Sequence, residues 1–262
     1  MMKKLIILLA AALFALVAAG CSGGGTATEK EKNTGVLAKI KQEKVLKVGT
    51  DATFKPFEYK NDGKYEGFDI DLIEAVAKEL GADKVEYVDT EFKGLIPGLL
   101  AKKFDMVVSA MYITDERKQT INFSDTYFPG GLSIMVKKDN TAIKGVNDLK
   151  GKKASVQIGT KSAKYLEEKY QEVKLVKVET NNDMFMELET GKVDAVVTGL
   201  PAARTYAKAK GTVTVLSDTL TEEFYGYGMR KEDGELATAV NAALKKVKDN
   251  GTYAAIVKKW FD

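Results

Sequence analysis

Residues 69–80 read DIDLIEAVAKEL, and the spacing of their apolar side chains shows how this part of the chain folds. Apolar residues recur every three or four positions, as one buried face of a helix requires. These residues are Ile70, Ile73, Val76, Ala77 and Leu80. Gly81 follows, and glycine is a common end of a helix. The stretch predicts an amphipathic helix over residues 69–80.

Short apolar runs on both sides of this helix predict strands. They cover residues 45–50, 84–88, 104–110, 154–158, 173–178 and 193–198. Further helices are expected over residues 235–251 and 253–261. Alternating strands and helices indicate an open, mostly parallel α/β sheet with right-handed crossovers.

The chain also repeats itself. LLAKKFDMVVSA (99–110) aligns with LETGKVDAVVTG (188–199) at an offset of 89 residues, with five identities. VGTD (48–51) aligns with IGTK (158–161). Two such matches indicate two similar lobes.

The repeat also indicates where a ligand binds, because ligands of open α/β sheets lie beyond the carboxyl ends of the strands. If the lobes face each other, the ligand lies between them. The first lobe contributes Asp51 and residues 109–114. The second contributes Thr160, Lys161, Thr198 and Gly199.

Composition excludes several kinds of chemistry. The 262 residues contain no histidine and a single cysteine, Cys21, which excludes Ser-His-Asp and Cys-His catalysis. The same counts disfavour a zinc site and rule out a disulfide within the chain. Forty basic and 37 acidic residues are interspersed, so nothing indicates nucleic acid as a partner. No cofactor or metal is expected.

The first 20 residues resemble a bacterial lipoprotein signal peptide. Two lysines precede the apolar stretch 5–19, which is too short for a comfortable transmembrane helix. Small residues then lead into Cys21, the expected site of lipidation, although Ala18 stands where leucine is usual. The alternative is ordinary secretory cleavage after Ala19, which leaves Cys21 as a free thiol.

Residues 21–35 are rich in glycine, threonine and charge, and they predict a flexible tether. Together with a lipidated Cys21, the tether implies an extracytoplasmic protein anchored to the cell membrane. The anchored protein would face the periplasm or lie on the outer face of the cytoplasmic membrane.

Arg117 stands where a cation is unusual. Thr114 is a good helix N-cap, and Asp115 and Glu116 suit the first turn, but a cation there opposes the helix dipole. Arg117 is either a solvated side chain on the outer face or a guanidinium that faces the cleft. In the cleft its rigid fork can hold a carboxylate through two hydrogen bonds. A helix that starts within residues 159–166 offers N–H groups to the same anion.

Several motifs resemble, in order, those of the bacterial extracellular solute-binding proteins of family 3, which bind polar amino acids. The resemblance covers residues 40–262, and the chain is similar to the glutamine-, arginine- and histidine-binding members. The motifs are GTDATFKPFEY (49–59), GFDIDLIEAVAKEL (67–80), residues 92–99, ITDERKQTINFSDTYF (113–128) and NGTYAAIVKKWF (250–261).

The resemblance implies the type II periplasmic-binding fold, in which two open-sheet α/β lobes are joined by a two-stranded hinge. It implies that lobe one comprises residues 36–129 and 227–262, and lobe two residues 133–223. Gly130, Gly131 and Gly226 would absorb the hinge rotation. Such proteins capture a polar amino acid or related small carboxylate between closing lobes and deliver it to an ABC-transporter permease. We expect a monomer.

The family's ligand-binding positions can be transferred residue by residue. Arg117 corresponds to the clamp on the ligand α-carboxylate, and Asp51 to an acid that meets the ligand side chain or amine. Aromatic residues, backbone positions and lobe-two contacts complete the set: Phe54, Phe92, Ala110, Tyr112, Gln157, Thr160, Lys161, Thr198 and Gly199. Phe57 is expected in the core, and Asp69 and Asp71 are expected to cap a helix.

Gly199 departs from the family pattern. An aspartate is usual there and pairs with the ligand α-ammonium, while a small residue is usual at Lys161. The site therefore loses a negative charge and gains a positive one. Asp51 takes over the ammonium, or the ligand is more negative, or it lacks an α-amine. Restoring the acid, Gly199→Asp, is expected to strengthen binding of zwitterionic amino acids.

A binding protein without chemistry is the expected function. The alternative is an enzyme that resembles cyclohexadienyl dehydratases, which needs a carboxylic acid in the cleft as proton donor, and Asp51 is the only candidate. A sensor module for a membrane kinase is disfavoured, because no kinase domain or transmembrane segment follows the last helix. The sequence does not name the ligand.

Overall fold

The computed structural model describes residues 35–217 and 219–262. The predicted signal peptide, Cys21 and all but the last residue of the predicted tether lie outside these residues. Within the described residues, no helix is both long and apolar enough to cross a membrane.

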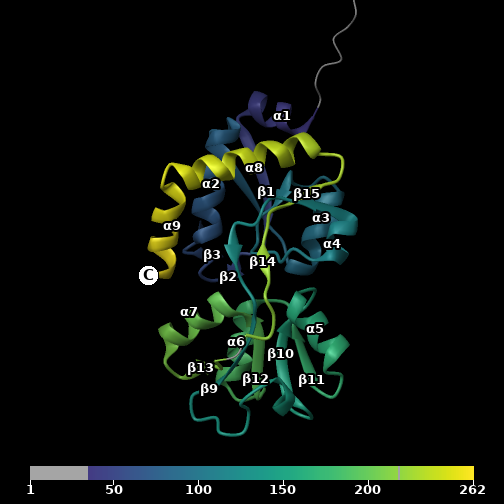
Figure 1. Ribbon diagram of the computed structural model, residues 1–262, viewed down its shortest axis with the longest axis vertical. Helices are drawn as coiled ribbons and strands as arrows, with labels where there is room; N and C mark the ends of the chain where they lie inside the picture. Colours follow the sequence, from purple (N-terminus) through teal and green to yellow (C-terminus); the bar gives the residue numbers. More distant parts are fainter. Residues whose placement is uncertain (1–34, 218) are drawn as a thin grey trace, which may run out of the picture. The chain divides into compact units, whose positions relative to one another are not determined.

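The first sheet has five strands in the order β5-β1-β6-β15-β7. β1 pairs in parallel with β5 and β6, whereas β15 runs antiparallel to β6 and β7. The strands are β1 (Val45–Thr50), β5 (Lys84–Asp89), β6 (Met106–Val107), β7 (Ile121–Phe123) and β15 (Gly228–Arg230). We call this sheet and the helices that cover it lobe one (Figure 1).

The second sheet repeats this arrangement in the order β11-β10-β12-β9-β13. Its strands are β9 (Leu132–Lys137), β10 (Lys153–Gln157), β11 (Lys174–Val178), β12 (Ala195–Gly199) and β13 (Val213–Val215). Here too the first three strands are parallel and the other two join antiparallel. The expected open sheets are therefore present in both lobes, but each sheet is mixed because the chain returns along its edge.

The ladder registers test the internal repeat. Val48 pairs with Met106, and Ala154 pairs with Ala195, and the predicted offset of 89 residues relates Met106 to Ala195. The same registers make Val48 equivalent to Ala154. The proposed match of VGTD with IGTK is therefore wrong by four residues.

That error has a physical reason. Gly49 lies inside β1, whereas Gly159 lies beyond the end of β10 with φ of +79°. Gly49 is therefore a strand residue, and Gly159 is a turn residue in the left-handed conformation. Counting from the correct register, Asp51 is equivalent to Gln157.

Helices cover each sheet. Lobe one carries α1 (Val36–Glu43), α2 (Phe68–Leu80), η1 (Phe92–Gly94), α3 (Leu95–Leu100), α4 (Asp115–Thr120), α8 (Gly234–Asp249) and α9 (Thr252–Phe261). Lobe two carries η2 (Val146–Leu149), α5 (Lys161–Lys169), α6 (Asn181–Glu189) and α7 (Leu200–Lys210). The C-terminal helices α8 and α9 pack on α2, as Figure 1 shows.

The predicted helix over residues 69–80 is confirmed as α2, and Ile73 and Val76 are fully buried. Gly81 ends the helix in the left-handed conformation, as expected. The expected capping role of its two aspartates is wrong, because no side chain caps α2. Asp69 instead accepts hydrogen bonds from Ala110 N and Tyr127 Oη, and Asp71 accepts from Trp260 Nε1.

Two chain crossings join the lobes through a short ladder. β8 (Phe128–Pro129) pairs antiparallel with β14 (Phe224–Tyr225), which gives the expected two-stranded hinge (Figure 1). Tyr225 is fully buried and lies edge-on to Phe57, with ring centroids 5.1 Å apart. The apolar core of lobe one therefore continues into the hinge. Phe57 belongs to this core, as expected.

A small antiparallel sheet extends lobe one toward the ligand region. It consists of β2 (Thr53–Phe54), β3 (Glu58–Asn61) and β4 (Lys64–Glu66). Gly67 follows β4 with φ of +137°, and a Cβ there would lie 2.0 Å from the carbonyl oxygen of Phe57. This close approach holds the small sheet against the start of α2.

Gly67→Ala is therefore expected to lower the free energy of unfolding by at least about 2 kcal/mol, through backbone strain and overpacking. Urea denaturation measures the change. Gly234→Ala is the matched control, because no atom lies within 4 Å of its Cβ position and it begins a helix. We expect the control to be neutral or slightly stabilising. Equal effects of the two substitutions would contradict the packing argument.

Candidate functional site

A small cavity, of about 30 Å³, lies between the carboxyl ends of strands from both lobes. Ten of the eleven predicted ligand-binding residues line it, namely Asp51, Phe54, Phe92, Ala110, Tyr112, Gln157, Thr160, Lys161, Thr198 and Gly199. Arg117 is the eleventh and does not. Ser109 also lines the cavity and belongs to the nominated segment 109–114, whereas five further lining residues escaped the sequence analysis: Glu58, Leu132, Ser162, Asn181 and Tyr225.

Asp51 meets lobe two directly across this cavity. It follows β1, is 3% exposed, and its Oδ2 accepts a 2.5 Å hydrogen bond from Gln157 Nε2. Its Oδ1 accepts from Thr53 Oγ1 at 2.8 Å. Burial raises the pKa of Asp51 to about 6, because desolvation outweighs these two hydrogen bonds. The equivalent strand ends of the two lobes therefore touch each other.

Two phenylalanines line the cavity from lobe one. Phe54 lies in β2 and stacks on Phe57, with ring centroids 5.6 Å apart. Phe92 lies in η1, and the Arg117 guanidinium carbon is 5.4 Å from its ring centroid. The core thus supports one ring and a cation contacts the other.

Arg117 lies between the lobes rather than on the solvated outer face. Thr114 caps α4 as expected, and Arg117 Nη1 and Nη2 donate to the carbonyl oxygens of Tyr112 (2.7 Å) and Gly159 (3.1 Å). Gly159 belongs to lobe two. Arg117 lines a second cavity, and Thr160 and Lys161 line both cavities. Burial lowers the pKa of Arg117 to about 10, so the guanidinium stays charged at neutral pH.

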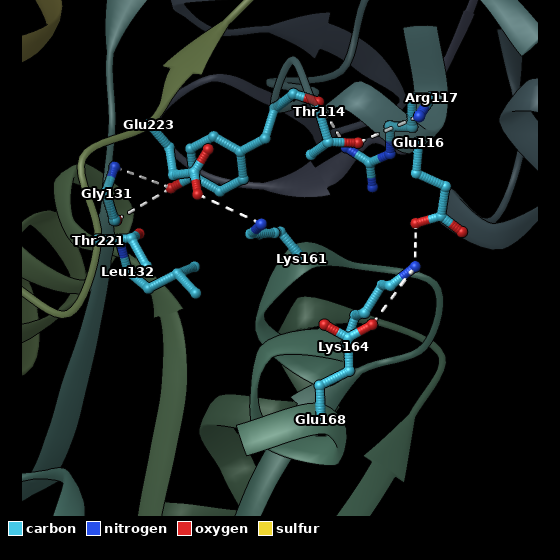
Figure 2. A network of polar contacts seen from close by, with 11 residues as sticks. Thr114, Glu116, Arg117, Gly131, Leu132, Lys161, Lys164, Glu168, Thr221 and Glu223 are labelled. Atoms are coloured by element: carbon cyan, nitrogen blue, oxygen red, sulfur yellow. Dashed lines mark hydrogen bonds and ion pairs between the residues drawn. The ribbon is translucent and has the colours of Figure 1, made fainter. Parts of the chain in front are cut away.

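Further contacts join the lobes beside the cavity. Lys164 Nζ pairs with the carboxylate of Glu116 (Figure 2), and Lys93 Nζ lies 2.6 Å from Glu179 Oε1. Both pairs are exposed, so each contributes little free energy on its own. Their positions on lobe-one and lobe-two elements nevertheless favour the arrangement in which the cavity is enclosed.

Lys161 has an acidic partner. Its Nζ lies 3.5 Å from Glu223 Oε1, and Figure 2 shows the two side chains pointing toward each other. Glu223 lies on the crossing just before β14. The positive charge that the sequence adds at position 161 is therefore matched within the protein.

Gly199 lies where tyrosine hydroxyls fill the space. A Cβ on Gly199 would lie 2.6 Å from Tyr225 Oη and 3.1 Å from Tyr112 Oη. Tyr225 Oη donates to Tyr112 Oη at 3.0 Å, and Tyr112 Oη in turn donates to the carbonyl oxygen of Gly131 at 3.0 Å. Both rings are buried, so neither moves away easily. An acid at position 199 therefore has a steric cost, and its effect on ligand binding stays a prediction.

A group of buried carboxyls lies at the lobe-one wall. Asp69 accepts from Ala110 N at 2.8 Å and holds that residue at φ of +36°, while burial raises the pKa of Asp69 to about 7. Glu58 Oε1 accepts from Ser109 Oγ at 2.9 Å. Burial, followed by the charge of Asp69, raises the pKa of Glu58 well above its usual value. The sequence pattern did not show that Glu58 is buried. Its neighbour Phe57 is buried as well, so buried and exposed residues do not alternate here.

Among residues 35–217 and 219–262, no cluster of acidic or cysteine side chains has an arrangement suited to a metal ion. The lining instead offers carboxyls, amides, hydroxyls and aromatic rings, which suit a small polar organic ligand.

The chain belongs to the bacterial extracellular solute-binding proteins, family 3, whose model matches residues 46–262. The arginine-binding extracellular protein ArtP of Bacillus subtilis is 36% identical, with 99% of this chain and 98% of that protein covered. Solved structures of the same fold confirm the expected two-lobed architecture.

One of these is the ancestral amino acid-binding protein AncCDT-1, a precursor of cyclohexadienyl dehydratase. It is 46% identical with a TM-score of 0.82, covering 86% of this chain and 99% of its own. Another is an ancestral arginine-binding protein bound to arginine. It is 44% identical with a TM-score of 0.80, and the match covers 83% of this chain and 98% of that chain.

The Gly199–Tyr225 contact leads to a prediction about stability. Gly199→Asp is expected to lower the free energy of unfolding by about 1–3 kcal/mol, because its Cβ overlaps a buried hydroxyl. Tyr225→Phe removes that hydroxyl, so the substitution should cost less in the Tyr225→Phe background. Urea denaturation of both single variants and the double variant gives their coupling energy. Strictly additive effects would mean that Tyr225 does not restrict position 199.

Proposed function

We propose that this protein is the substrate-binding component of an ABC importer, which encloses an amino acid between its lobes and passes it to a permease. The observation that carries the proposal is the cavity lined from both lobes, with Asp51 and Gln157 in contact across it. Family membership and the arginine-binding relative support an amino acid as ligand. We further propose that the protein acts as a monomer.

In this proposal Arg117 holds the ligand α-carboxylate. Its two terminal amino groups now donate to carbonyl oxygens, which are neutral acceptors. A carboxylate is the stronger partner for the guanidinium fork, because both sides of each hydrogen bond are then charged. Thr160 and Lys161 begin α5 beside Arg117, and the free N–H groups of the first turn favour the same anion.

We propose that the protein carries out no chemistry on its ligand. The neighbour related to cyclohexadienyl dehydratase is itself described as an amino acid-binding protein. The raised pKa values of Asp51 and Glu58 do provide carboxyl groups that can hold a proton, as the alternative requires. Incubation with a cyclohexadienyl substrate should nevertheless give no aromatic product above the uncatalysed rate. Turnover that Glu58→Gln abolishes would establish the enzyme instead.

Arg117→Ala tests the binding proposal. Loss of a buried, charged hydrogen-bond pair should weaken binding by at least about thirtyfold. A thermal-shift screen of the common amino acids first identifies a ligand, and calorimetry then measures Kd for the wild type and the variant. Arg204→Ala, on the exposed face of α7, is the control and should leave Kd unchanged. An unchanged Kd in Arg117→Ala would remove Arg117 from the site, and a folded wild type that binds no amino acid would refute the proposal.

Lipid anchoring through Cys21 is the second part of the proposal, and it rests on the signal-like N-terminal sequence alone. Two acyl chains on one cysteine give a stable anchor, because each buried methylene contributes about 0.8 kcal/mol. Mass spectrometry of the mature protein should find an acylated N-terminal Cys21, and Cys21→Ser should release the protein from membranes. A mature N-terminus at Gly20 without lipid would exclude the anchor.

A further inference from the structure

A short segment of lobe one, residues 111–113, contacts both chain crossings. The first crossing runs through β8 and the second through β14. On the second crossing, Ile113 N donates to the carbonyl oxygen of Phe224 at 3.0 Å, and Gly226 N donates to the carbonyl oxygen of Met111 at 3.1 Å. The same segment reaches the first crossing through its central side chain, so it holds both crossings.

The hydroxyl of Tyr112 binds both backbone polar groups of Gly131 on the first crossing. Tyr112 Oη donates to the Gly131 carbonyl oxygen at 3.0 Å and accepts from Gly131 N at 3.2 Å. The carbonyl oxygen also accepts from Leu200 N at 2.8 Å. Burial raises the pKa of Tyr112 to about 12, so the hydroxyl keeps its proton at neutral pH and can serve as donor and acceptor together.

The two crossings also bind each other beside this hydroxyl. Leu132 N donates to Thr221 Oγ1 at 3.1 Å, and Gly130 N donates to the carbonyl oxygen of Glu223 at 2.7 Å. Figure 2 shows Gly131 and Leu132 next to Thr221. Whatever holds Gly131 in place therefore acts on both crossings.

Glycines of the crossings are packed closely against the 111–113 segment. A Cβ on Gly130 would lie 2.5 Å from Cε1 of Tyr112, and a Cβ on Gly226 would lie 2.7 Å from Cδ1 of Ile113. Gly131 has φ of +116°, a conformation that favours glycine. Close approach is thus a reason for glycine here in addition to the predicted hinge rotation, and the crossings are held by contact at these positions.

We propose that Tyr112 is a positioning residue whose hydroxyl, by holding Gly131, stabilises the arrangement in which the lobes enclose the cavity. This inference rests on the proposed function, in which the lobes enclose an amino acid. Tyr112 belongs to lobe one, whereas Gly131 leads directly into β9 of lobe two. Rotation of the lobes moves these two partners relative to each other. The hydroxyl therefore acts on affinity through the hinge rather than through a contact with the ligand.

Loss of the hydroxyl should weaken the binding of every ligand by the same factor. Gly131 is buried, and without Tyr112 Oη its N–H loses this acceptor in the enclosed arrangement, which costs free energy. The enclosed arrangement is then less populated. The observed Kd rises in inverse proportion to the fraction of molecules that can enclose the ligand. That fraction does not depend on which amino acid binds.

Tyr112→Phe tests the inference, because it removes the hydroxyl and keeps the ring that stacks on Tyr225 with ring centroids 4.5 Å apart. Calorimetry measures Kd for L-arginine, L-glutamine and any further amino acid found by the thermal-shift screen. We expect each ligand to bind at least about fivefold more weakly, with affinity ratios unchanged within about twofold. Tyr87→Phe, which removes a hydroxyl that donates to Glu74, is the control and should leave Kd unchanged.

Amide hydrogen exchange of the protein without ligand separates a hinge effect from a ligand contact. In Tyr112→Phe, Leu200 N keeps its acceptor, the Gly131 carbonyl oxygen, so faster exchange there reports a loosened hinge rather than a deleted bond. We expect the amides of Gly131 and Leu200 to exchange at least about fivefold faster than in the wild type. The amide of Val76 in α2 is the internal control and should exchange at the same rate.

Each other result would overturn the inference. Weaker binding with unchanged exchange would make the Tyr112 hydroxyl a ligand contact. Faster exchange with unchanged Kd would make it a structural group without effect on binding. A loss confined to one of several ligands would indicate selectivity rather than a hinge effect. All three results leave the proposed function intact, whereas a folded wild type that binds no amino acid would refute both.

Discussion

The hydrogen bond between Asp51 and Gln157 is the contact around which this molecule is organised. These residues stand at equivalent ends of β1 and β10, so the internal repeat brings two copies of one position face to face. One copy is a carboxyl and the other an amide, and the difference makes a hydrogen bond instead of a repulsion. The contact also fixes where the cavity is, because both side chains line it.

Burial, more than pairing, sets the electrostatics of the site. Asp51, Glu58 and Asp69 lie at the lobe-one wall, and desolvation is the largest cause of the raised pKa of each. Cations are present nearby, but they are paired elsewhere. Lys161 faces Glu223, and Lys164 faces Glu116 across the lobes (Figure 2). The protein thus keeps its acidic wall uncompensated while its basic groups stabilise contacts around the cavity.

Sequence reasoning identified those features that depend on local pattern. The 3.6-residue period gave α2, and the repeated Asp-x-Val-Val strand placed β6 and β12 in equivalent positions. The family resemblance placed ten residues that line the cavity. Sequence reasoning missed the contacts between residues that are distant in the chain and meet only in the folded structure. Nothing beside Glu58 in the sequence indicates that it lies under Ser109, and nothing beside Gly199 indicates two tyrosine hydroxyls. The register of β10 also escaped, because a glycine-threonine pair occurs both in a strand and in a turn.

The contact between Gly199 and Tyr225 also bears on how this protein can change over evolutionary time. Position 199 ends a strand of lobe two, while Tyr225 belongs to the hinge ladder. A larger residue at 199 costs less stability after the hydroxyl at 225 has been lost than before. The order of the two mutations is thereby biased, because an acid at 199 is tolerated better once Tyr225 has changed. A change at the end of this lobe-two strand and a change in the hinge ladder are then expected to occur together.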